Sequence, residues 1–222
     1  MSTGEVTVSD KRRGRGRDGR VYPPLVAATG VDATLDRFLT RAEKLGVKIH
    51  RAGSSAEEVA RAVVEAIRAE GASSAMVADD LGAGRDDVVR ALEAAGVAVV
   101  PGATPEAADP VEASVSRAAF AVAETGSIGV VGNALQPRLA TMLPPVHVAL
   151  VDRAVLFPSL DDAGAELERL MTPGPDGVRY ASLVTGPSRT ADVEKTLAVG
   201  VHGPRVVHLV LVERSPALAG AG

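Results

Sequence analysis

Helix and strand patterns alternate along the first half of the chain, and this alternation limits the possible folds more than any other sequence feature. Residues 32–45 carry apolar side chains at helical spacing, and a short strand pattern follows at 47–50. A second helix pattern begins at Ser55, which forms a capping-box signature with Glu58, and extends to about Glu70. Such alternation is typical of a parallel sheet flanked by helices.

The pattern continues to residue 100 and then changes. We expect a strand at 74–78, a helix at 86–95 and a strand at 97–100. The apolar runs 118–123 and 128–131 are too close for a helical crossover, so we expect antiparallel or sharply bent strands there. One further helix is expected at 161–171, and three further strands are expected at 146–151, 181–184 and 206–212. The sequence therefore predicts an α/β fold whose sheet is mostly parallel and has an antiparallel portion.

The composition permits a full hydrophobic core but provides few aromatic side chains. The chain has 222 residues, of which 46% are hydrophobic, with only three Phe and two Tyr. Aromatic platforms for stacking single-stranded nucleic acid are therefore nearly absent. The Ala- and Val-rich helices would allow a homo-oligomer.

Charge divides the chain into a basic tail and an acidic body. Residues 1–20 hold six basic and three acidic side chains, so this segment carries a charge of +3. Since the whole chain carries −4, the remaining residues carry −7. We expect residues 1–20 to be a disordered tail, which could touch RNA or an acidic surface, and residues 21–222 to form a single domain. The acidic body argues against nucleic-acid binding as the main role.

The chain contains no cysteine, which excludes disulfides, a thiol nucleophile and thiolate ligands for zinc or iron–sulfur clusters. The four histidines show no close metal-ligand spacing, so no metal site is predicted. No window of about 18 uninterrupted apolar residues exists, and no apolar stretch follows the basic N-terminus. We therefore expect a cytoplasmic protein without membrane contact.

The segment after the strand pattern 181–184 is typical of a ligand loop. Gly186 lets the backbone turn sharply, and Pro187 stops the strand. The hydroxyls of Ser188 and Thr190 can donate hydrogen bonds or cap a short following helix. The guanidinium of Arg189 is suited to a carboxylate or phosphate. The alternative is a capped strand-to-helix turn with a surface arginine.

A second candidate site lies between the strand patterns 118–123 and 128–131. There the carboxylate of Glu124 stands beside the hydroxyls of Thr125 and Ser127, and Gly126 permits a tight turn or a close ligand. Partial burial would suit Glu124 to general-base work or nucleophilic attack. The alternative is a polar hairpin turn.

Three further features carry weaker signals. His202 could orient a substrate carbonyl or shuttle a proton, but a histidine in a Gly-Pro loop can equally be structural. For His147 and His208, structural roles are expected. The segment 81–85 lacks the third glycine of a dinucleotide fingerprint. In open α/β sheets ligands collect at the carboxyl ends of strands, so we expect several of these loops to meet there.

The order of these motifs resembles the LUD-domain family, specifically its lactate-utilization protein C branch. The resemblance covers about residues 25–213, and its most specific part is the stretch 185–204. Four segments carry it: Ala123–Ser127, Leu143–Val148, Thr185–Glu194 and Gly200–Pro204. The chain has Ser127-Ile128-Gly129 where many relatives have a threonine and bulkier β-branched residues.

The resemblance implies a fold like that of CoA transferases and ribose-5-phosphate isomerase. It also implies a role in oxidising L-lactate to pyruvate as one of three components, with iron–sulfur clusters in the partner proteins. No cofactor would then be bound by this chain.

Three hypotheses for its chemistry stay open. In the first, the chain is a non-redox subunit that binds a small carboxylate or a partner's active site. Arg189 would hold the carboxylate, and Glu124 or His202 would move protons. Alternatively it is an independent acyl-CoA-transferase-like or phosphosugar enzyme that uses Glu124, or a non-catalytic assembly or regulatory subunit.

Overall fold

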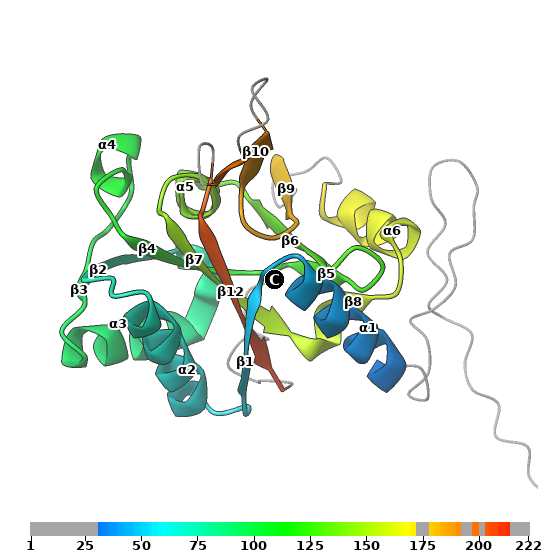
Figure 1. Cartoon of the computed structure of the whole chain (residues 1–222), viewed down its shortest axis with the longest axis horizontal. Coiled ribbons are helices and arrows are strands. Elements are labelled where there is room, and N and C mark those ends of the chain that lie inside the picture. Colours follow the sequence, from blue (N-terminus) through cyan, green and yellow to red (C-terminus); the bar gives the residue numbers. More distant parts are fainter. Residues whose placement is uncertain (1–30, 172–177, 192–196, 200–202, 214–222) are drawn as a thin grey trace, which may run out of the picture.

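Six parallel strands form the main sheet of the computed structural model, which describes residues 31–171, 178–191, 197–199 and 203–213. Their spatial order is β1 (Lys48–Ala52), β12 (Val206–Val212), β7 (Val146–Asp152), β4 (Ala113–Arg117), β2 (Ser74–Val77) and β3 (Ala98–Val99). The last strand in the sequence therefore lies between the first strand and β7. Because β1 pairs with β12 alone among the described strands, it forms one edge of the sheet (Figure 1).

Two amphipathic helices cover one face of this sheet, α2 (Ala56–Ala69) and α3 (Arg85–Ala94). They pack on alternate residues of the strands, including Val148 and Val210. The predicted capping box starts α2: the amide of Glu58 donates to Ser55 Oγ over 3.2 Å, and the Ser55 amide donates to Glu58 Oε2 over 3.4 Å. The two caps satisfy amides that the first helical turn leaves unpaired.

The other face is covered by α1 (Val31–Lys44) and a second sheet. The intervening strand residues, such as Ala149 and Leu209, pack against Phe38 of α1 and Ile128 of the second sheet. A parallel sheet needs apolar cover on both faces, and here a helix and a sheet share one of them. The strand β7 is accordingly buried along its whole length.

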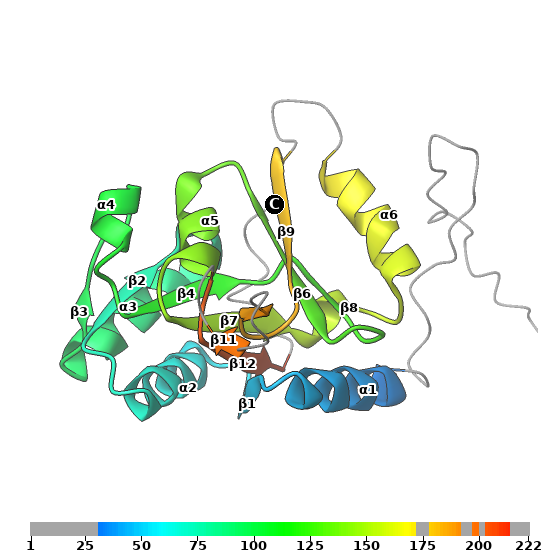
Figure 2. The same ribbon diagram turned by 45° about the horizontal axis from the view of Figure 1, so that its top comes forward.

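The second sheet has the order β8 (Leu156–Phe157), β5 (Phe120–Val122), β6 (Ser127–Gly132) and β9 (Tyr180–Val184). The strands β5 and β6 are antiparallel, as the short connection between them predicts, and β6 is antiparallel to β9. The helix α6 (Leu160–Leu170) packs on the outer face through Ala163 against Phe120 and Val122. Figure 2 shows β6 and β9 rising between α5 (Leu135–Met142) and α6.

The remaining elements are short. They are η1 (Asp79–Gly84), α4 (Pro105–Ala108), α5 (Leu135–Met142), η2 (Arg153–Val155), β10 (Arg189–Ala191) and β11 (Leu197–Val199). None of the described helices is long and apolar enough to cross a membrane.

The predicted fold class is confirmed: a mostly parallel sheet flanked by helices, with an antiparallel portion. Sequence analysis missed the central strand β4 and the helix α5. In β4 two serines alternate with apolar residues, and both are fully buried because their hydroxyls find partners. Ser114 Oγ donates to the carbonyl of Ala140 in α5 over 2.6 Å, and Ser116 Oγ lies 2.8 Å from His147 Nε2. The predicted tail, residues 1–20, lies outside the described residues.

His147 is one of the structural histidines expected from the sequence. It is fully buried in β7, and this burial lowers its pKa to about 4. The ring is therefore neutral at neutral pH and serves as the partner of Ser116 inside the sheet.

We expect Gly129→Ala to destabilise the protein, because a Cβ at this β6 position would lie 2.2 Å from Cζ of the buried Phe120 ring. Such overpacking typically costs about 1–3 kcal/mol. Gly164→Ala in α6 is the matched control, since a Cβ there meets nothing within 4 Å. That variant should gain up to about 1 kcal/mol of helix stability. Chemical denaturation compares the two, and equal unfolding free energies would contradict the packing of Phe120 on Gly129.

Candidate functional site

The two loops singled out in the sequence lie side by side at one end of the second sheet. The antiparallel pairing of β6 with β9 places Ile128 opposite Val184. The next residues outward are Ser127 and Thr185, whose hydroxyl oxygens are 2.7 Å apart. Ser127 is buried and Thr185 is exposed, so this hydrogen bond ties the loops together at the boundary between the core and solvent.

The C-terminal end of α1 holds both loops in place. Gly126 has a φ of +72°, and a Cβ on it would lie 2.8 Å from the backbone nitrogen of Ala42. Gly186 has a φ of +83°, and a Cβ on it would lie 3.1 Å from Cβ of Leu45. Each glycine therefore has two structural roles: it allows a left-handed turn, and it lets the loop approach the end of the helix closely.

Glu124 stands at the outer side of this arrangement and is exposed. Its Oε2 accepts a hydrogen bond of 3.0 Å from the amide of Leu160, the first residue of α6. The partial burial that would suit Glu124 to general-base or nucleophilic chemistry is absent, and its carboxylate instead helps to cap a helix. Thr125 Oγ1 accepts a weak hydrogen bond of 3.4 Å from the amide of Ser127 within the turn.

The second loop continues into a strand rather than a helix. The amide of Ser188 donates to the carbonyl of Pro204 over 2.9 Å, next to Gly203. Arg189 and Thr190 belong to β10, where they pair with Val199 and Ala198 of β11. A helix capped by Ser188 or Thr190, the alternative interpretation of this loop, is therefore wrong. His202 lies outside the described residues.

The candidate site does not lie at the carboxyl edge of the main sheet, where we expected the loops to meet. The contact of Gly186 with Leu45, just before β1, and that of Ser188 with Pro204, just before β12, place the second loop at the amino ends of these strands. At the carboxyl edge, Asp80 accepts a hydrogen bond of 3.3 Å from the amide of Arg117. Burial raises the pKa of Asp80 to about 7.

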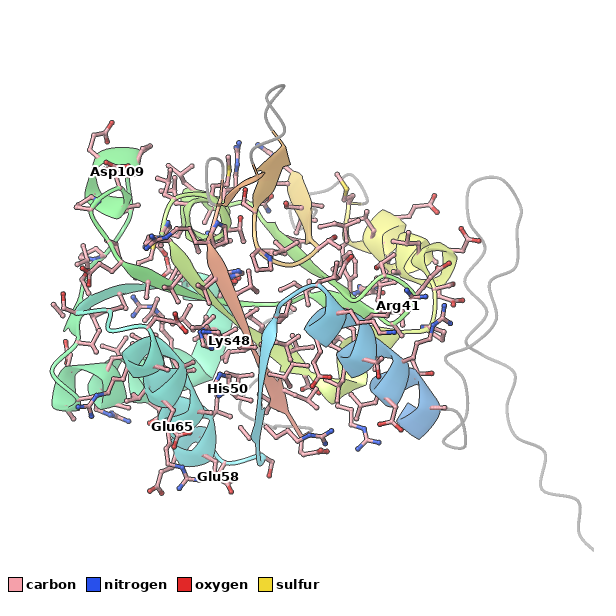
Figure 3. The ribbon with its side chains drawn as sticks, in the orientation of Figure 1. Arg41, Lys48, His50, Glu58, Glu65 and Asp109 are labelled. Carbon is pink, nitrogen blue, oxygen red and sulfur yellow. The ribbon has the colours of Figure 1, made fainter. Side chains whose placement is uncertain are left out.

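Arg41 is a candidate residue that sequence analysis did not identify. It lies in the last turn of α1, is exposed, and has its Cβ 2.9 Å from the Cβ position of Gly126 (Figure 3). Its guanidinium makes no hydrogen bond or ion pair with the residues that the structure describes. An unpaired guanidinium on a residue that packs at the Gly126 turn can bind a carboxylate through two hydrogen bonds. No local sequence pattern indicates this contact, because Arg41 and Gly126 are 85 residues apart in the sequence.

Among the described residues, no three His, Cys, Asp or Glu side chains are grouped so that they could hold a metal ion. The polar side chains described at the site are hydroxyls, the exposed carboxylate of Glu124 and the guanidinium of Arg41. Such groups can bind an anionic ligand and hold or accept a proton.

A known protein family matches the part of the chain that contains both loops. A model of the family described as "LUD domain" matches residues 35–212, which include both loops and all the strands of the two larger sheets. This chain belongs to the LUD-domain family. The resemblance predicted from the sequence is thereby confirmed.

Three related bacterial proteins each match about half of the chain or slightly less. Lactate utilization protein C of Exiguobacterium sp. is 35% identical over 115 residues, 50% of this chain and 49% of that protein. The protein of the same name from Anoxybacillus flavithermus is 30% identical over 110 residues, 49% of this chain and 48% of that protein. An uncharacterized protein of Neisseria meningitidis is 38% identical over 96 residues, 43% of this chain and 40% of that protein. The chain thus spans about half the length or less of these relatives.

A solved structure supports the fold. The crystal structure of a DUF162 family protein from Deinococcus radiodurans superimposes with a TM-score of 0.58 at 20% identity. The match covers 85% of this chain and 99% of that one. At this identity the likeness establishes the fold alone.

We expect Gly126→Ala to disturb the site more than the same change at a matched position. Gly71 has nearly the same φ, +71°, but a Cβ there meets nothing within 4 Å. Gly71→Ala should cost about 1–2 kcal/mol, the strain of a left-handed non-glycine residue. Gly126→Ala should cost about 1–3 kcal/mol more, because its Cβ also presses on the backbone of α1. Chemical denaturation measures both, and equal losses would contradict the packing of this turn against α1.

Proposed function

We propose that this chain is a non-redox component of an L-lactate oxidation system. In this proposal, its paired loops bind a small carboxylate or a partner's active site, and iron–sulfur partner proteins carry the electrons. Membership of the LUD-domain family and the relatives named lactate utilization protein C support the pathway. The observation that supports the site is the hydrogen bond between Ser127 and Thr185, which brings together the two motifs from distant parts of the chain.

The ligand proposed for the loops is a short carboxylate such as lactate. Arg41 and Arg189 would hold the carboxylate, since a guanidinium offers two parallel donors to its two oxygens. The hydroxyls of Ser127 and Ser188 would orient the rest of the ligand. Glu124, exposed at the rim, would take up or return a proton. Because the chain has no cysteine, thiolate-bound clusters would belong to the partners.

Growth on L-lactate tests the pathway and the site together. In a strain lacking this gene, we expect wild type to restore growth and Glu124→Gln and Arg189→Ala to fail. Glu124→Gln is the sharper change, because its amide oxygen can still accept the hydrogen bond from Leu160 while the charge and the base are lost. Thermal melting of the purified variants checks that they fold.

Two outcomes would contradict parts of this proposal. If all variants restore growth, the pathway stands but the loops serve assembly rather than binding. If growth never depends on the gene, lactate oxidation is wrong for this chain. Exposure to acyl-CoA followed by mass spectrometry would then test acyl transfer to Glu124.

Arg41→Ala is expected to weaken binding of L-lactate to the purified chain. Loss of a charge-assisted hydrogen bond typically costs about 1.5–3 kcal/mol, or roughly 10- to 150-fold in Kd. Arg37→Ala, one turn earlier on α1 and also exposed, is the matched control and should bind like wild type. Titration followed by NMR or calorimetry measures Kd. Equal affinity for wild type and Arg41→Ala would remove Arg41 from the site.

A further inference from the structure

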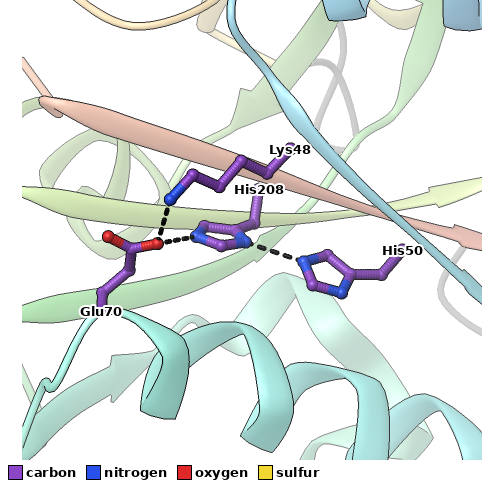
Figure 4. A network of polar contacts seen from close by, with 4 residues as sticks. All are labelled: Lys48, His50, Glu70 and His208. Atoms are coloured by element: carbon purple, nitrogen blue, oxygen red, sulfur yellow. Dashed lines mark hydrogen bonds and ion pairs between the residues drawn. The ribbon is translucent and has the colours of Figure 1, made fainter.

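A chain of four polar side chains joins the edge strand β1 to β12 and α2, separate from the candidate site. Lys48 Nζ and His208 Nε2 both contact Glu70 Oε1, at 2.5 Å and 3.0 Å (Figure 4). The other ring nitrogen of His208, Nδ1, lies 2.8 Å from His50 Nε2 (Figure 4). The two imidazole rings stack with their centroids 5.1 Å apart.

The contacts determine where the protons lie. Hydrogen bonding from Lys48 is the largest cause that lowers the pKa of Glu70, so its carboxylate is ionised and only accepts. His208 must therefore carry its hydrogen on Nε2, which leaves Nδ1 as an acceptor. His50 then carries a hydrogen on Nε2 and donates it to His208. Both tautomers are thus set by Glu70 at the end of the chain.

The facing nitrogens can share one hydrogen but not two. A first added proton can bind at Nδ1 of His50 and leave the bond to His208 intact. When both rings are imidazolium, however, each facing nitrogen carries a hydrogen, and neither can accept. The hydrogen bond is then replaced by repulsion between two cations 2.8 Å apart at the facing atoms.

Some of the charged groups around the pair favour protonation of the rings, and others oppose it. Lys48 on β1 opposes protonation of both rings, whereas Glu65 on α2 favours it at His50 and Glu70 favours it at His208. Burial is the largest cause at both rings, and the pKa of each is lowered. The pair therefore contributes stability above the ordinary histidine pKa, and this contribution is lost as the pH falls below it.

The pair acts on a strand whose backbone is paired on one side only. In the described sheet β1 has one neighbour, β12, and Lys48 is paired in register with His208 itself. The residues directly before β1 include Leu45 and Val47, which a Cβ on Gly186 of the candidate site would meet at 3.1 Å and 3.7 Å. A change in the position of β1 would thus reach the second loop within a few residues.

We propose that the His50–His208 pair is a proton-controlled lock: it holds β1, and with it the loop Thr185–Ser188, against the main sheet, and protonation of both rings releases them. The lock is a property of the fold and does not depend on what the loops bind.

Hydrogen exchange followed by mass spectrometry tests the lock between about pH 7.5 and about pH 5, where histidine titrates. After correction for intrinsic rates, amides of β1 and of residues 183–188 should exchange about tenfold faster at the lower pH. A tenfold change corresponds to the loss of about one net hydrogen bond. His50→Gln should abolish the acceleration, because its amide can donate to His208 and does not ionise.

Three outcomes of the exchange experiment would overturn the lock. These are no acceleration in the wild type, equal acceleration in His50→Gln, or acceleration centred on β7, which would indicate His147 instead. Acceleration of β1 alone would overturn the link to the loop. If His50→Gln does not fold, ring nitrogen shifts of the wild type replace it. Ionisation of both rings together near their ordinary pKa, with no change in β1 exchange, would also overturn the proposal.

Discussion

The main sheet has to be buried on both faces, and most of the architecture follows from how that cover is shared. The helices α2 and α3 cover one face, as in many α/β proteins. On the other face the chain leaves β4 at Arg117 and continues almost directly into β5, which begins a second sheet at Phe120. That sheet and α1 together cover the face of the main sheet that lies opposite α2 and α3. The candidate site lies where these two covering elements meet.

The end of α1 connects the chemistry of the site to the packing of the core. Residues on its buried side, such as Phe38 and Leu39, are part of the apolar contact with the main sheet. The residues at its C-terminal end instead meet two glycine turns that come from distant parts of the sequence. The same helix thus fixes the spacing of the two loops by the contacts that bury its apolar face. A loop pair positioned in this way is held by rigid elements rather than by the loops themselves.

Much of this fold was predictable because its signals are local. Helical spacing, a capping box and strands bounded by glycine or proline identify α1, α2, α3 and most of the main sheet. The strand β4 was missed because its serines resemble a polar segment, and only the distant partners Ala140 and His147 explain how they can be buried. The two loops were recognised, but not their packing against α1 or the position of Arg41 beside the Gly126 turn, since these depend on tertiary packing. The expectation of a site at the carboxyl edge failed because β9, which ends at the second loop, belongs to the second sheet.

The position of β12 between β1 and β7 has a consequence for how the chain can be assembled. His50 and His208, neighbours in the folded protein, are 158 residues apart in sequence. During synthesis the first strand must therefore wait for nearly the whole domain before its only partner in the described sheet emerges from the ribosome. Until then β1 lacks its partner strand, and the closing contact carries the entropy of a long loop. The central strands can pair earlier, and α1 can already pack on β7 and the second sheet, so the edge formed by β1 is among the last parts of the domain to be completed.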